Sequence, residues 1–166
     1  MWHNVRVIDY IKGQQVIHCR DGLAVIVDET VIADNEYFVV RTARGSGENI
    51  YVPKARAGVI IRNIMTEAEA DELVKYMRSV DVEFNPNTKQ RRDGLKRRLG
   101  SGEVKDIAFL FKQLYLYRTL KDGSVKFGPV DLDMLEYASN NLLDELSISY
   151  NKPRDQIEVF IYNKLK

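Results

Sequence analysis

Hydrophobic positions follow two different spacings along this chain, and the change falls near Asn63. Before that point, short runs rich in β-branched and aromatic residues alternate with turn signals such as Lys12-Gly13 and Asp21-Gly22. Runs of this kind predict the strands of a small sheet or barrel. The predicted strands span 15–19, 23–29, 36–43, 49–52 and 59–62. Five short strands in so short a stretch favour an SH3-like or Tudor-like barrel over a sandwich.

Beyond Ile64 the spacing of the hydrophobic positions becomes helical. Thr66 and Glu69 form a capping-box pattern, and Leu73 and Met77 then repeat at helix spacing. Turns at 85–87 and 121–123 interrupt the helical pattern. The further predicted helices span 89–99, the segment from an N-cap at Ser101 to Leu114, 132–146, and a last helix over 153–165 that opens with Pro153.

The two spacings predict an α+β protein with two domains. A small SH3-like or Tudor-like β-barrel occupies residues 1–64, of which 1–9 form an N-terminal extension. An all-α domain of about five helices occupies residues 65–166. With 45% hydrophobic and 30% charged residues, the chain can bury a core, which excludes disordered and collagen-like classes.

Neither a membrane span nor a secretory signal is predicted. Nowhere do eighteen apolar residues follow one another, and Arg6, Asp9 and Lys12 interrupt the N-terminal stretch that a signal peptide would need. We therefore expect a cytoplasmic protein without membrane partners. One cysteine and two histidines supply neither an internal disulfide nor a Cys/His zinc cluster.

Motifs for enzymatic chemistry are also missing from the sequence. It contains no Walker A sequence, no G-x-G-x-x-G after a strand and no H-E-x-x-H. His18 and Cys19 lie within a strand pattern, which favours a structural role over a nucleophile with its base. The sequence therefore predicts a protein that is not an enzyme and that has no catalytic residues, no metal site and no cofactor.

The most uneven charge lies in residues 87–98, where six basic residues accompany only Asp93. A helix would align Lys89, Arg92 and Lys96 at i, i+3 and i+7. Such a face suits a row of phosphates and a salt-sensitive affinity that does not depend on sequence. The competing interpretation is a solvated helix face.

The predicted strand over 49–52 favours an edge position, because it ends at Pro53 and proline cannot donate to a sheet ladder. An exposed edge can pair with a strand of another protein, with Ile50 or Tyr51 giving specificity. Ordinary pairing within the barrel is the alternative.

Several segments resemble the CarD-type regulators of bacterial transcription. The first is YIKGQQVIHCRDGLAVI at 10–26, whose pattern is shared with the polymerase-binding module of transcription-repair coupling factors. EYFVVRT and NIYVP continue the likeness in the first half. RRLGSGEVKDIAFLFKQL at 97–114 and DMLEYASNNLLDEL at 133–146 continue it in the helical half. The resemblance covers residues 10 to about 148.

The resemblance implies a non-enzymatic factor that docks its Tudor-like barrel on the β subunit of RNA polymerase. Its helical domain would then contact promoter DNA at the upstream edge of the transcription bubble and modulate the stability of the open complex. The implied polymerase-binding residues are Thr30, Val31, Ile32, Glu48, Asn49, Ile50, Tyr51 and Val52. In relatives that make this contact through arginines, the matching places are near Val31 and at Tyr51, which implies a more apolar contact here.

The resemblance and the basic cluster together imply a set of DNA-binding residues. They are Thr88, Lys89, Arg91, Arg92, Lys96, Arg97 and Arg98. Thr88 stands where the family carries a wedge tryptophan, and threonine has no ring to stack on a base. Asp93 stands where relatives carry a lysine, and Phe84 is the nearest aromatic that could replace the wedge.

Two other function classes remain open at this stage. An SH3-like barrel also suits an RNA-binding or ribosome-associated module, with which the glycine turns at Gly13 and Gly22 are compatible. A nuclease that uses scattered acids ranks behind it, because no paired carboxylates with metal-ligand spacing are evident.

Overall fold

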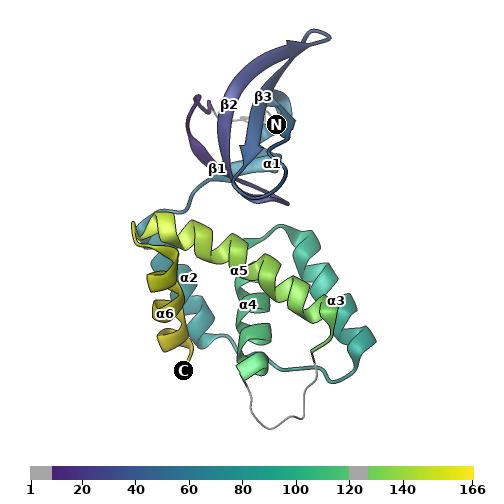
Figure 1. The fold of residues 1–166 in the computed structure, drawn as a ribbon, viewed down its shortest axis with the longest axis vertical. Helices are drawn as coiled ribbons and strands as arrows, with labels where there is room; N and C mark the ends of the chain where they lie inside the picture. Colours follow the sequence, from purple (N-terminus) through teal and green to yellow (C-terminus); the bar gives the residue numbers. More distant parts are fainter. Residues whose placement is uncertain (1–8, 120–126) are drawn as a thin grey trace, which may run out of the picture. The chain divides into compact units, whose positions relative to one another are not determined.

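A computed structural model describes residues 9–119 and 127–166 and divides the chain into two compact units (Figure 1). The first unit ends at Ile64 and the second begins at Met65. The first holds an antiparallel sheet and the second holds helices, so the predicted α+β class is confirmed. The predicted turn at 121–123 lies outside the described residues.

From residue 9 onward, the sheet unit contains five antiparallel strands in the order β4-β3-β2-β1-β5. Its elements are β1 (Gln15–His18), β2 (Gly22–Ile32), β3 (Asn35–Thr42), β4 (Asn49–Pro53), the 3₁₀ turn η1 (Lys54–Arg56), α1 (Ala57–Ile60) and β5 (Ile61–Asn63). Because β4 and β5 stand at the two ends of this order, the sheet is open, and the barrel expectation holds only loosely. One face carries the core of the unit, built around Tyr10, Ile26, Phe38, Val40 and Val52.

The predicted strand over 59–62 is wrong in its first half. Residues 57–60 form the helical turn α1, and only Ile61–Asn63 pair with β1. The buried Ala57 anchors this turn against the core of the sheet unit. Packing therefore overrides the strand propensity of these β-branched residues, because strand propensity depends strongly on tertiary context.

The β2–β3 hairpin turns at Ala33 and Asp34, because Ile32 pairs directly with Asn35. Both turn residues have positive φ angles, 48° and 64°. This is the backbone that a two-residue hairpin with the right twist requires, although alanine rarely adopts it. The strand bulges between Ile26 and Asp28, where the pairing register shifts.

Within residues 65–119 and 127–166, five helices form the second unit. They are α2 (Glu67–Ser79), α3 (Thr88–Ser101), α4 (Val104–Thr119), α5 (Pro129–Ser149) and α6 (Arg154–Leu165). The capping box of Thr66 and Glu69 is confirmed at the start of α2. Ser101 is not the N-cap of the next helix but the last residue of α3, which ends at Gly102 with φ 70°. A positive φ at Gly102 reverses the chain before α4 can begin.

Helix α5 packs against each of the four other helices of the unit. Its buried residues Leu135, Leu142 and Leu146 belong to one apolar cluster together with residues of the other helices. The same helix holds the chain at the entrance of the unit, because the Met65 amide donates to Glu145 and the Ser149 hydroxyl donates to the Met65 carbonyl. Figure 1 shows α3 on the side of α4 that faces away from α6.

Candidate functional site

The basic segment forms α3, and local capping fixes where that helix begins. The Asn87 side chain accepts a hydrogen bond of 3.0 Å from the Gln90 amide, and Thr88 is the first helical residue. Arg91 and Leu95, one turn apart, are the buried positions of the helix. The rest of α3 is mostly polar, with Leu99 as a further residue that packs against the core of the unit.

Arg91 is bound inside the helical unit, although the sequence placed it on the DNA-binding face. Its Nε and Nη2 donate to the Asp131 carboxylate at 2.9 Å each, and its Nη1 donates to the Asn85 carbonyl at 2.9 Å. The guanidinium carbon lies 4.6 Å from the centroid of the Phe84 ring. Only 4% of the Arg91 side chain is exposed. Its donors are directed inward, which corrects the expectation that it contacts phosphate.

Asp131 completes this buried pair from the first turn of α5. Burial by itself raises the pKa of the Asp131 carboxyl, but hydrogen bonds from Arg91 and from the Gly128 amide, together with the charge of Arg91, hold that pKa below its ordinary value. The carboxylate is therefore ionised at neutral pH. A charge-assisted bidentate pair of this kind fixes α3 on α5.

Phe84 is likewise engaged in the unit and is not a free wedge. Its ring lies 4.4 Å from that of Tyr117 and 6.0 Å from that of Phe127, centroid to centroid. Its backbone amide donates to the Tyr117 hydroxyl. The structure therefore favours the core role for Phe84 over its alternative role as a replacement wedge.

Arg98 is only partly engaged in contacts within the helical unit. Its Nη1 lies 2.8 Å from Asp106, and its guanidinium carbon lies 3.6 Å from the centroid of the Phe109 ring. The Ser101 hydroxyl donates to the same Asp106 carboxylate. Since 38% of the Arg98 side chain is exposed, it can still meet a ligand, with its charge partly neutralised by Asp106.

The remaining basic residues of the cluster face outward. Lys89, Lys96 and Arg97 are exposed, as is Thr88, and no ion pair holds any of these three cations within the described parts of the chain. Arg92 is half-buried near Gly128, and its Nε is buried without a hydrogen-bond partner there. Helical periodicity places the exposed Asp93 between the two lysines and Arg97.

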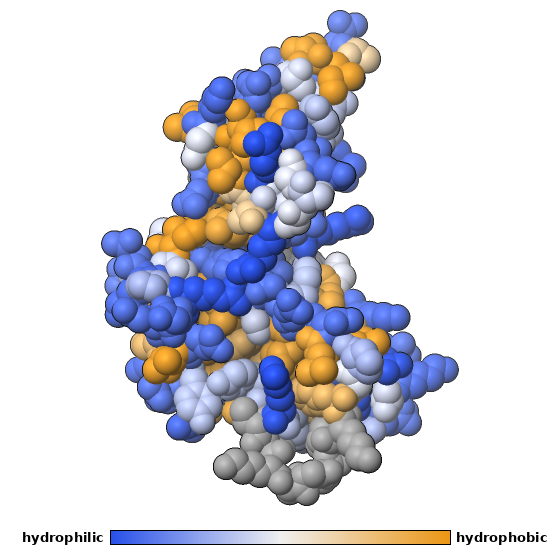
Figure 2. All heavy atoms as spheres, in the orientation of Figure 1, coloured by the Kyte–Doolittle hydropathy of each residue, from blue (hydrophilic) through white to orange (hydrophobic). Residues whose placement is uncertain are grey.

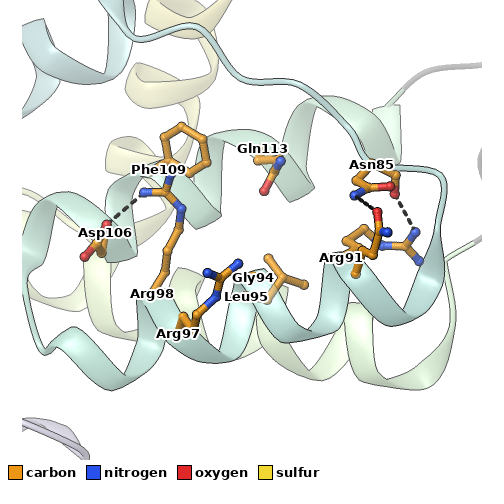
Figure 3. A pocket seen from close by; sticks show the side chains of 10 residues that line it. Asn85, Arg91, Gly94, Leu95, Arg97, Arg98, Asp106, Phe109 and Gln113 are labelled. Atoms are coloured by element: carbon orange, nitrogen blue, oxygen red, sulfur yellow. Dashed lines mark hydrogen bonds and ion pairs between the residues drawn. The ribbon is translucent and has the colours of Figure 1, made fainter.

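A hollow of about 480 Å³ separates α3 from α4 (Figure 3). Figure 3 shows Arg97 projecting from α3 and Gln113 from α4 into its open middle, with Arg98 and Phe109 at one end and Asn85 and Arg91 at the other. Its lining residues are Asn85, Gln90, Arg91, Gly94, Leu95, Arg97, Arg98, Asp106, Phe109 and Gln113.

The residues of the predicted polymerase-binding surface lie on β2 and β4, with Glu48 just ahead of β4. Strand β4 stands at an edge of the sheet, and among the described residues it pairs with β3 alone. Thr30, Asn49 and Tyr51 line one shallow hollow of about 420 Å³ on the sheet. Ile50 is half-buried and Glu48 is exposed.

Val52 departs from this arrangement, because its side chain is 1% exposed and belongs to the core of the sheet unit. Val31 and Ile32, by contrast, are exposed large hydrophobic residues near the hairpin turn, and Tyr51 is a third on β4. Figure 2 shows hydrophobic atoms at the projecting end of the β2–β3 hairpin. An exposed apolar hairpin together with an edge strand is typical of a protein-binding surface.

His18 ends β1, and Cys19 follows it in the turn toward β2. His18 is buried, and its Nδ1 accepts from the Arg20 and Asp21 amides and lies 2.9 Å from the Asp21 carboxylate. Burial lowers the pKa of His18, although the charge of Asp21 opposes this effect. Cys19 is exposed. The imidazole therefore organises the β1–β2 turn.

Within residues 9–119 and 127–166, no three His, Cys, Asp or Glu side chains come together as metal ligands would. Nor is any helix in these ranges long and apolar enough to cross a bilayer.

Sequence reasoning missed the residues that meet α3 from distant parts of the chain. Asp131 lies 40 residues beyond Arg91, and Phe109 and Gln113 reach the hollow from α4. The available signal for Asp131 was its place three residues after Gly128, at the start of an apolar helical pattern, where a carboxylate stabilises the first turn. Nothing local links it to Arg91.

Comparison with models of protein families identifies a family for the helical unit. The model described as CarD, C-terminal domain, matches residues 72–162, which is more than half of the chain and includes α3, α4 and α5. No curated protein matches the chain.

Proposed function

Because the chain belongs to the CarD family, whose members regulate transcription without being enzymes, we propose that it binds promoter DNA through α3 and the β subunit of RNA polymerase through its sheet unit. The observation that carries this proposal is the family match across a helical unit in which α3 carries three exposed cations, Lys89, Lys96 and Arg97. The proposed effect is a change in the stability of the open promoter complex, with contact at the upstream edge of the bubble.

The proposed DNA surface consists of Lys89, Lys96 and Arg97, with Arg92 at its margin and Arg98 at its end. Lysine and arginine on an exposed helix face bind phosphates and release counterions. Arg91 is left out, because both of its outer nitrogens are occupied by Asp131 and Asn85. Thr88 is exposed at the start of the helix, where its hydroxyl can donate to a phosphate but cannot stack.

The proposed polymerase surface consists of the β4 edge and the outer end of the β2–β3 hairpin. Main-chain groups of β4 would pair with a strand of the β subunit, and Tyr51, Val31 and Ile32 would add apolar contact. Val52 would contribute its backbone alone, since its side chain fills the core. The family match favours this function over an RNA-binding or ribosome-associated module.

Retention of the polymerase β subunit on the immobilised full-length protein tests the docking half of the proposal. The wild-type protein and Ile11→Glu, which alters an exposed apolar side chain ahead of β1, should both retain the subunit. Tyr51→Glu should lose retention, because a carboxylate would enter the apolar contact. Failure of the wild-type protein to retain the subunit, or equal retention by Tyr51→Glu, would show that the docking surface is wrong.

A further inference from the structure

The hollow between α3 and α4 contains hydrogen-bonding groups that a row of phosphate contacts would not use. Gln113 donates through its Nε2 to the Glu83 carbonyl, and Figure 3 shows its amide oxygen turned into the hollow. The Asn85 side chain donates to the side-chain amide oxygen Oε1 of Gln90 at 3.1 Å, which leaves the NH₂ group of Gln90 available. The hollow thus offers both an acceptor and a donor.

This mixture discriminates between ligands. A phosphate has only acceptor oxygens, so the Gln113 oxygen and the Asp106 carboxylate, both in the lining, would repel it. The edge of a nucleobase carries donors and acceptors side by side, and carboxamides complement such an edge. The polar lining therefore fits a base better than a phosphate.

One end of the hollow is flat and partly apolar. The Arg98 guanidinium lies on the Phe109 ring, 3.6 Å from its centroid, and the hydrogen bond to Asp106 fixes the plane of that group. Leu95 adds an apolar surface to the lining. Proteins that bind unpaired nucleotides stack the bases on aromatic rings and on arginine planes.

Arg97 would serve the phosphate of the same nucleotide. It is exposed, it projects into the hollow, and it holds no ion-pair partner within the described residues. Lys96 is its neighbour in the chain, so a strand whose phosphates follow α3 would pass the opening. A volume of about 480 Å³ falls in the range of pockets that hold small organic groups.

We infer that the hollow between α3 and α4 receives the base of one unpaired DNA nucleotide, stacked toward Arg98 and Phe109 and hydrogen-bonded by Gln90 and Gln113, with its phosphate on Arg97. This inference rests on the proposed DNA binding by α3. It adds a site for a base to a surface that otherwise reads only phosphates.

Gly94 provides a direct way to close the hollow. It lies in the lining, and a Cβ added there meets nothing within 4 Å. Gly94→Leu would therefore start a side chain from open space at the wall of the hollow, and it would favour the helix because glycine is a poor helix former. Gly100→Leu is the matched control, since Gly100 lies in the same helix, has equally open space and does not line the hollow.

The experiment measures the affinity of the full-length protein for three DNA probes. One is a fully paired duplex, one carries a single unpaired nucleotide, and one carries an abasic nucleotide at the same place. Wild type and Gly100→Leu should bind the unpaired nucleotide roughly tenfold more tightly than the other two probes. Gly94→Leu should bind all three equally, with the duplex affinity of the wild-type protein. Gln113→Ala, a second variant, should reduce the preference in the same direction.

Three outcomes would overturn the inference while DNA binding stands. If the abasic probe bound as tightly as the probe with the intact unpaired nucleotide, the hollow would bind phosphate and not a base. A preference that survives in Gly94→Leu would place the base elsewhere. A free deoxynucleoside monophosphate that binds without DNA, and loses binding in Gly94→Leu, would make the ligand a free nucleotide. If the wild-type protein bound no duplex at low salt, the proposed function itself would fail.

Discussion

Arg91 on α3 and Asp131 on α5 share two hydrogen bonds of 2.9 Å each, in a place where the carboxylate is fully buried and the guanidinium nearly so. Arg91 is the buried basic residue of α3, and the pair joins it to the first turn of α5. The pair therefore sets how α3 lies on α5, and with it the direction in which Lys89, Lys96 and Arg97 face.

Removing one partner of this pair should destabilise the helical unit strongly. Asp131→Ala leaves a buried guanidinium without its counter-charge, which costs about 3–5 kcal/mol. The double variant Arg91→Met with Asp131→Leu should cost less than either single change, because no unpaired charge remains. Urea unfolding followed by circular dichroism measures these differences, with Lys89→Met as an exposed control. Equal losses for Lys89→Met and Asp131→Ala would contradict the structural role of the pair.

The same pair should make stability depend on acid pH. Because Arg91 and Gly128 hold the pKa of Asp131 below its ordinary value, the carboxylate stabilises the folded state above the unfolded pKa of about 4, and that contribution is lost as the pH falls through the lower folded value. The difference in unfolding free energy between wild type and Asp131→Asn should therefore shrink below about pH 4. A difference that stays constant between pH 7 and pH 2 would show that the pair does not lower this pKa.

The hairpin turn offers a stabilising substitution in the sheet unit. Ala33 has a φ of 48°, a conformation that costs alanine roughly 1 kcal/mol and that asparagine tolerates. Ala33→Asn should raise the melting temperature of the sheet unit, whereas Ala33→Val should lower it because branching at Cβ worsens the clash. Thermal unfolding of both variants tests this turn. A more stable valine variant would mean that the turn has a different backbone.

Asp93 should limit the affinity of α3 for DNA. It is exposed between the cations of the helix, so Asp93→Lys removes a repulsion and adds one phosphate contact. The affinity should rise, and the slope of log affinity against log salt should steepen by about 0.9. Glu158→Lys, the same charge change at an exposed place on α6, should change the slope less. Equal effects of the two substitutions would assign the binding to net charge alone.

Local signals explain what the sequence predicts well. The capping box of Thr66 and Glu69 involves residues three apart, so its pattern alone sets the start of α2. The strands predicted over 15–19 and 36–43 also follow from local sequence patterns, and the structure places them at Gln15–His18 and Asn35–Thr42. A helix or strand forms where it is predicted when the hydrophobic periodicity and the turn residues indicate the same structure.

Tertiary contacts explain what the sequence could not predict. Ala57–Ile60 turns into a helix because Ala57 packs on the sheet core, and Ser101 extends α3 because Gly102 supplies the left-handed turn one residue later. Arg91 and Lys89 look alike in a basic cluster, yet Asp131 draws only Arg91 inside. A charge pattern counts basic residues without showing which of them face solvent.

The salt dependence of DNA binding tests most directly the claim that the exposed face of α3 holds DNA. Four phosphate contacts through Lys89, Arg92, Lys96 and Arg97 predict a slope of log affinity against log salt of roughly −3.5 for the wild-type protein. Replacing Lys89, Lys96 and Arg97 with glutamine should flatten the slope to about −1. The control replaces three lysines outside α3, and it should keep the wild-type slope; these are Lys152, Lys164 and Lys166. An α3 variant whose slope equals that of the wild-type protein would contradict the account.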